Sequence, residues 1–217
     1  MTTLSPDLIA ALLFFGLLPF IIIGVTCFTK FAVVLSILRN AIGVQQIPPN
    51  IVLYSIATIM SLYVMLPVFL QAGAPIDSAL AKGEPVLSRT QEIVKPFLEF
   101  TTRHTRQQET DFFVDTAKKL WGEKLANELT GPKATNLSKL IIAMPAFMVS
   151  ELTKAFQIGF LLFLPFVVID LITSNVLLAL GMSTLSPITV SLPIKILLFI
   201  GLNGWQRVLE SLALSYT

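Results

Sequence analysis

AFQIGFLLFLPFVVIDLITSNVLLALGMSTLSPITVSLPI, residues 155–194, contains one charged side chain, Asp170, in forty positions. The only obvious turn in this stretch is the segment from Gly181 to Pro187, because glycine and proline interrupt helices. We therefore expect two antiparallel apolar helices joined by that turn. The second helix is predicted to continue through Lys195 to about Trp205.

Charged residues elsewhere are concentrated in the middle of the chain. Eighteen of the 28 formal charges fall between Asp77 and Asn136, nine of each sign, and both flanks are almost uninterruptedly apolar. A bilayer accepts about 20 consecutive apolar residues and penalises charges among them. The pattern predicts a membrane-associated chain in three segments. These are N-terminal hydrophobic helices in residues 1–76, a water-facing helical insert in 77–136, and a C-terminal hydrophobic helical hairpin in 137–217.

Composition and motifs exclude several classes of function. The hydrophobic content is 54% and the charged content 13%, whereas soluble proteins average about 45–50% and about 25%. A net charge of +2 without a basic patch argues against nucleic-acid binding. No positive region precedes the first apolar run, so we expect no cleavable signal peptide. The single cysteine, Cys27, and the single histidine, His104, form neither a metal site nor a nucleophilic pair. No enzyme, cofactor or metal site is predicted.

Prolines recur within the apolar segments, at positions 19, 67, 145, 165 and 193. The first apolar run, residues 8–29, is expected to kink at Pro19, and a polar connector over residues 40–50 separates it from the second run, 51–70. Broken backbone at membrane depth needs neighbouring protein to satisfy its polar groups. A chain this short has few helices to supply that cover, so we expect an oligomer.

Six charged residues lie inside or against the apolar helices: Lys30, Arg39, Glu151, Lys154, Asp170 and Lys195. Each costs roughly 2.5–3.5 kcal/mol at mid-bilayer. Lysine and arginine near a helix end can extend to the headgroups, which suffices for Arg39 and leaves Lys30 open. The alternative is that the charges face protein partners or a water-filled path and contribute to assembly.

Asp170 must face protein or a water-filled path, because its side chain is too short to reach bulk water from the middle of the apolar stretch. Measured from a turn near Thr184, Asp170 is 14 residues away and Lys195 is 11, so their depths differ by about 4.5 Å. We predict that they pair across the hairpin. Glu151 and Lys154 lie on one helix face and are expected to neutralise each other within one turn.

Two long motifs go beyond composition. Residues 29–50, TKFAVVLSILRNAIGVQQIPPN, form the first. The second begins with MPAFMVSELTKAFQIGF at 144–160 and continues with LPFVVID at 164–170 and the segment from Ser186-Pro187 to Lys195. Together they resemble the FliP/SctR family of the type III secretion export apparatus, over both apolar halves. The form of residues 39–50, the short length and the missing signal peptide are similar to the injectisome branch.

The resemblance implies a virulence-associated, multi-pass protein of the bacterial inner membrane with its insert in the periplasm. Family members form a pentamer that combines with two smaller kinds of export subunit into a helical, cone-shaped pore. Unfolded secreted proteins pass through its centre, and this subunit hydrolyses nothing. Much of the complex is lifted toward the periplasm, so apparent spans need not contact lipid.

A methionine-rich loop closes the pore in the family, since flexible thioethers seal and yet yield to varied side chains. The matching positions here are Met182, Ser183, Thr184 and Leu185, and only Met182 remains of the methionine run. The resemblance therefore implies a gate role for this turn, with Met182 first and Leu185 second.

Two other functions are open from the residues alone. A small-solute or ion transporter using the buried charges as a relay predicts inverted halves with helices broken in matching places, which we do not find. A membrane-embedded enzyme lacks the acid–base or metal cluster that it requires.

Overall fold

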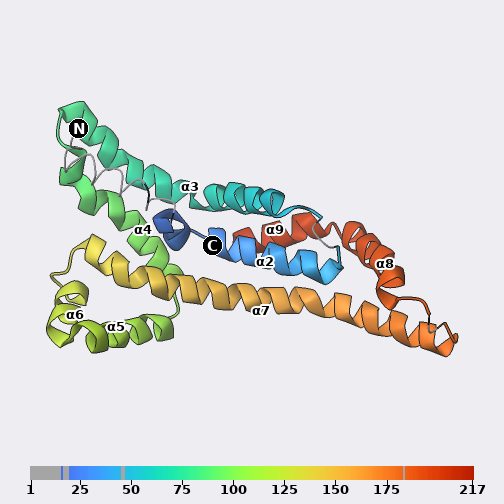
Figure 1. Cartoon of the computed structure of the whole chain (residues 1–217). Helices are drawn as coiled ribbons and strands as arrows, with labels where there is room; N and C mark the ends of the chain where they lie inside the picture. Colours follow the sequence, from blue (N-terminus) through green and yellow to red (C-terminus); the bar gives the residue numbers. More distant parts are fainter. Residues whose placement is uncertain (1–15, 17–19, 45–46, 183) are drawn as a thin grey trace, which may run out of the picture. The chain divides into compact units, whose positions relative to one another are not determined.

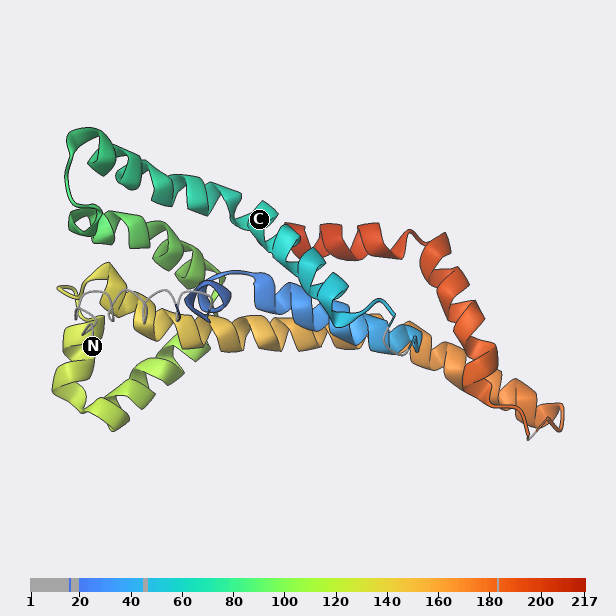
Figure 2. The same cartoon turned by 45° about the horizontal axis from the view of Figure 1, so that its top comes forward.

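The computed structural model describes residues 16, 20–44, 47–182 and 184–217, almost all of them in helices (Figure 1; Figure 2). The named elements are α2 (Phe28–Ile42), α3 (Asn50–Lys82), the short 3-10 helix η1 (Val86–Arg89), α4 (Thr90–His104), α5 (Gln107–Trp121), α6 (Glu123–Thr130), α7 (Asn136–Ala179), α8 (Pro187–Gly201) and α9 (Gly204–Leu214). No strand occurs in these ranges, which confirms the predicted all-α class. Pro19 and its predicted kink lie outside the described residues.

The chain divides into two compact units. The insert unit comprises Met1–Thr29 with Met65–Glu151, and the hairpin unit comprises Lys30–Val64 with Leu152–Thr217. The division falls inside α3 and α7, so both long helices run through the two units. The predicted segment boundaries at residues 76 and 136 were drawn from hydropathy, whereas the two compact units are defined by contacts within the chain. The predicted boundaries therefore remain a prediction.

The insert unit is helical, as the charged middle segment predicted. Arg89 holds the turn before α4, because its guanidinium contacts Glu84 at 2.9 Å and Glu92 at 3.0 Å. Hydrogen bonds to these two carboxylates raise the pKa of the Arg89 guanidinium. Gly122, with φ of +83°, ends α5, and α6 begins at the next residue.

Apolar side chains form a core in the insert unit where α5, α6 and α7 meet. Ala117, Ala126 and Ile142 are buried there, with Phe113, Val114 and Leu129 packed around them. Further along, Phe100 of α4 packs edge-on against Phe147 of α7, with ring centroids 5.8 Å apart.

The hairpin unit is built around α2. Phe31, Val34, Leu35 and Leu38 of this helix are fully buried or nearly so. Gly159 of α7 permits close packing, because a Cβ there would lie 2.5 Å from Cδ1 of Ile37. From the far end of α7, α8 begins after a turn and α9 follows it (Figure 2).

The long helices expose apolar side chains along their length. Phe156 and Leu161 of α7 are 61% and 66% exposed, and Leu197 of α8 is 74% exposed. Among the described residues, α3 and α7 are long and apolar enough to cross a membrane, and α8 with α9 makes a third span if the bent pair counts as one. Apolar surface on this scale requires lipid or other protein to cover it. The predicted membrane association is therefore supported by the fold.

The helix predicted to run to Trp205 ends at Gly201, so that prediction was wrong. Asn203 adopts the left-handed conformation, with φ of 52°, and α9 departs from α8 at 59°. The bend brings Trp205 edge-on against Phe199, with ring centroids 5.2 Å apart. Gly204 lies directly against the Phe199 ring, which leaves no room there for a Cβ.

Replacing Gly204 with alanine should destabilise the hairpin unit by about 1–3 kcal/mol, because the added methyl must displace the Phe199 ring. Thermal unfolding of the detergent-solubilised protein measures the effect. Gly201→Ala is the matched control: nothing lies within 4 Å of the new Cβ, so the better helix propensity of alanine should leave the melting temperature equal or higher. Equal melting temperatures for the two variants would show that the Phe199 ring does not limit the size of the side chain at position 204.

Candidate functional site: a buried charge cluster and a hairpin turn

The ammonium group of Lys195 is the centre of the polar cluster in the hairpin unit. Lys195 is 5% exposed, and its Nζ donates to Oδ2 of Asp170 at 2.5 Å. The hydroxyl of Ser191 donates to the other carboxylate oxygen of Asp170 at 2.6 Å. Ser191 and Lys195 are four residues apart on α8 and therefore share the face turned toward α7. The predicted pair across the hairpin is present.

Lys195 also bonds a third helix. Its Nζ donates to the backbone carbonyl of Ala41 at 3.2 Å. Ala41 lies in the last turn of α2, where carbonyls have no partner within the helix and where the helix dipole favours a cation. Gly43, with φ of +87°, follows the end of α2, and a Cβ there would lie 3.9 Å from the lysine nitrogen. One ammonium group thus joins α2, α7 and α8.

A second buried cation lies at the other end of α2. Lys30 is 1% exposed, and its Nζ donates to the hydroxyl of Ser215 at 2.8 Å. The same nitrogen lies 3.5 Å from the ring centroid of Tyr216, which is cation–π geometry. Lys30 therefore faces protein within the hairpin unit and does not extend to a headgroup. The contact attaches the end of α9 to α2.

The other predicted charges occupy separate places. Arg39 donates from Nη1 to Oδ1 of Asn50 at 2.6 Å and to the carbonyl of Pro48 at 3.3 Å, which ties α2 to the start of α3 and to the connector before it. Glu151 is fully buried and Lys154 is half-buried. That these two side chains neutralise each other remains a prediction, as does the role of the six charges in assembly.

Several partners in these contacts were not anticipated from the sequence. Ser191 had a usable signal, since it precedes Lys195 by four residues on the same helix face. Ala41 contributes a backbone atom, and Ser215 and Tyr216 lie at the end of α9. No spacing rule connects those positions to a lysine on another helix.

The predicted gate turn joins α7 to α8. The N–H of Met182 bonds the carbonyl of Leu177, and the N–H of Gly181 bonds that of Leu178. With Gly181 left-handed at φ of +72°, this is a Schellman ending, which satisfies the last carbonyls of α7. Met182 and Leu185 are exposed, as is Thr184, while Ser183 lies outside the described residues. Pro187 then starts α8.

Among the described residues, no group of three or more His, Cys, Asp and Glu side chains is arranged to hold a metal ion. The buried polar side chains instead bond to one another between helices, and the outer faces of those helices are apolar. The fold and the cluster define an all-α, membrane-associated protein in which buried charges hold the helices together.

Comparison with known proteins identifies the family. The model of the FliP family matches residues 11–212, and the chain belongs to that family. Yop proteins translocation protein R of Yersinia pestis is 49% identical, over 97% of this chain and 95% of that protein. Harpin secretion protein HrcR of Erwinia amylovora is 41% identical over the full length of both chains. Virulence protein YscR of Salmonella typhimurium is 40% identical over 97% and 96%. These relatives place the chain on the injectisome branch of the family, as the motifs predicted.

Replacing Asp170 with asparagine should destabilise the hairpin unit by about 1–3 kcal/mol, because the Lys195 ammonium stays buried and loses its carboxylate partner, which is itself 40% exposed. Adding Lys195→Met should restore more than half of the loss, since an apolar pair of similar volume requires no charge to be desolvated. Resistance to urea unfolding in detergent measures each step.

Lys133→Gln removes an exposed charge of the insert unit and is the control, with a change of less than about 0.5 kcal/mol. A double variant no more stable than Asp170→Asn alone would show that the two side chains are not energetically coupled.

Proposed function

We propose that this chain is a core pore-forming subunit of the type III protein secretion export apparatus, which shapes and gates the channel for unfolded substrate proteins. The observation that supports this most is similarity along the whole chain to proteins named for translocation and secretion. The chain is accordingly a component of a protein-secretion machine, and it is located in a membrane.

The proposal also covers the oligomeric state of the chain, its partners, its membrane and its orientation. The chain forms a pentamer, combines with other export-apparatus membrane subunits, and resides in the bacterial inner membrane with residues 77–136 in the periplasm. It catalyses no reaction. Support comes from the exposed apolar faces of α7 and α8, which a ring of like subunits would cover, and from the charge balance of the insert, which suits an aqueous compartment.

The turn between α7 and α8 is the proposed gate. Its Met182 and Leu185 lie in the turn at the end of the hairpin and are 46% and 48% exposed. Around a symmetric ring, equivalent turns would meet at one narrow level, where apolar side chains close a pore by excluding water. Thr184 and Ser183 complete this segment.

Purification of the chain from its native membrane tests the assembly. A large complex that contains the other export subunits is expected. A monomer or dimer that conducts ions after reconstitution into liposomes would instead support the transporter alternative, in which Asp170, Lys195, Glu151 and Lys154 relay protons or ions. Size-exclusion chromatography with subunit identification, followed by liposome flux, separates the two.

Replacing Met182 with glycine should make the resting apparatus leak small ions, because the ring of apolar side chains loses its largest flexible member. Ion flux across membranes that contain the assembled complex is the measurement. Leu120→Ala, which truncates an exposed side chain of the insert, is the control and should leave flux at the level of the unmodified protein. An unchanged barrier in Met182→Gly would remove this residue from the gate.

A further inference from the structure

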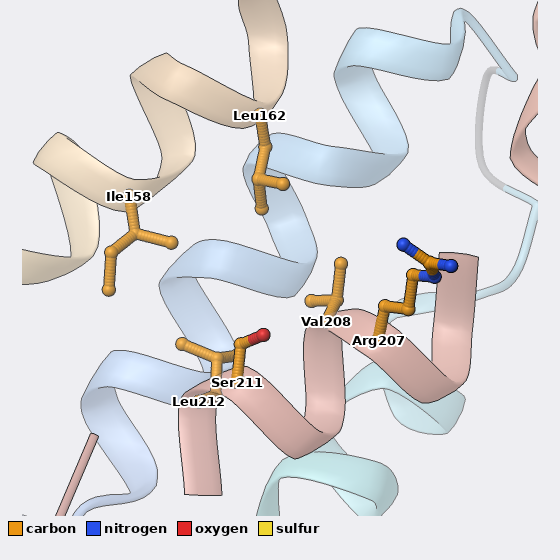
Figure 3. A pocket seen from close by; sticks show the side chains of 6 residues that line it. All are labelled: Ile158, Leu162, Arg207, Val208, Ser211 and Leu212. Carbon is orange, nitrogen blue, oxygen red and sulfur yellow. The ribbon is translucent and has the colours of Figure 1, made fainter. Parts of the chain in front are cut away.

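Two hollows on the hairpin unit share an edge on α9. The apolar hollow, of about 300 Å³, is lined by Ile158 and Leu162 of α7 and by Val208 and Leu212 of α9 (Figure 3). The polar hollow, of about 460 Å³, is lined by Asn203, Gln206 and Glu210 of α9. Arg207 and Ser211 line both. A ligand that filled the two together would be apolar at one end and polar at the other.

The polar hollow contains one positive and one negative side chain. Arg207 and Glu210 are three residues apart on α9 and so neighbour each other on the helix surface. Within the described ranges, the structure gives neither side chain a hydrogen bond or an ion pair. Both groups are exposed and available to an external partner. The matching ligand has an anionic and a cationic group close together.

We propose that these hollows bind a phospholipid with a phosphoethanolamine headgroup. The guanidinium of Arg207 accommodates the phosphate, since its planar donors match phosphate oxygens in pairs. The carboxylate of Glu210 accepts hydrogen bonds from the ammonium group. One acyl chain lies in the apolar hollow against Ile158, Leu162 and Val208 (Figure 3). This proposal requires the membrane location of the chain and not its proposed role in export.

The choice of headgroup follows from the number of N–H donors that its cationic group can offer to Glu210. An ionised carboxylate only accepts hydrogen bonds, and a primary ammonium group offers three N–H donors. A choline headgroup has a quaternary nitrogen without any N–H, so it gives Glu210 charge attraction alone. A phosphoglycerol headgroup has no cation and would place its phosphate beside the Glu210 carboxylate. Ethanolamine satisfies both charged residues.

Native mass spectrometry of the detergent-solubilised full chain tests the site. The probes are phosphatidylethanolamine, phosphatidylcholine and phosphatidylglycerol with identical acyl chains. The unmodified protein should bind phosphatidylethanolamine about fivefold more tightly than the other two, as expected for one partly exposed charge-assisted contact. Circular dichroism checks that each variant remains helical.

The variants separate the two ends of the headgroup. Arg207→Gln should weaken binding of all three lipids roughly tenfold, because each has a phosphate. Glu210→Gln should remove the preference for ethanolamine over choline and strengthen binding of phosphatidylglycerol, whose phosphate no longer faces a carboxylate. Leu162→Trp fills the apolar hollow without changing charge and should weaken binding of all three lipids. Lys124→Gln and Glu128→Gln, on exposed positions of α6, are matched charge controls that should change nothing.

Three outcomes would overturn the proposal. The first is equal binding of the three lipids by the unmodified protein. The second is binding that Arg207→Gln leaves unchanged. The third is a photo-crosslinker at Gln206 that captures another polypeptide in native membranes and no lipid, which would assign the hollows to a protein partner with the complementary charge pair.

Discussion

The buried ammonium group of Lys195 is the constraint on which the hairpin unit depends. It is almost fully enclosed in a unit whose other buried side chains are mainly apolar, and it bonds the carboxylate of Asp170 and the carbonyl of Ala41. Removing Asp170 alone leaves the buried ammonium group without a carboxylate, which is more costly than removing both charges. The relative position of α2, α7 and α8 is therefore restricted to arrangements that keep the three groups in contact. Apolar packing tolerates sliding and rotation, whereas these directional bonds do not.

The turn at the end of α7 determines whether the contact can form. Gly181 stops α7 in the left-handed conformation, and Pro187 starts α8, so the two helices begin and end at defined residues. Asp170 and Lys195 then lie at similar distances from the turn. An insertion of one residue on either side would rotate one partner by about 100° around its helix and break the pair. The same hairpin that presents Met182 at its tip thus also determines the pairing in its interior.

The long apolar runs and the Gly181–Pro187 turn were enough to predict the all-α class and the hairpin. The Asp170–Lys195 pair was predictable because a short acidic side chain within forty apolar positions must find a cation at its own depth. The contact of Lys30 with Tyr216 was not predictable, because it depends on how α9 returns to α2. The end of α8 was misplaced because the prediction followed the apolar run and passed over Gly201 and the Asn203-Gly204 dipeptide, which are turn signals. There the packing of Trp205 on Phe199 favours the bend over a continuous helix. The division into two compact units, which falls inside α3 and α7, was not predictable either, because it depends on contacts in the folded chain and not on hydropathy.

The location of these charged contacts matters for the function that we propose. A channel for varied polypeptides must open by moving subunits past one another, and a buried ion pair broken during that motion would leave desolvated charges. Asp170, Lys195 and Lys30 instead make their contacts within one chain. The outer faces of α7 and α8 are left apolar, with side chains such as Leu161 and Leu197 exposed. Contacts between such faces are non-directional and lose little when they shift. In the proposed ring, rigid polar bonding inside each subunit and apolar contact between subunits would together allow the aperture to change while every member keeps its fold.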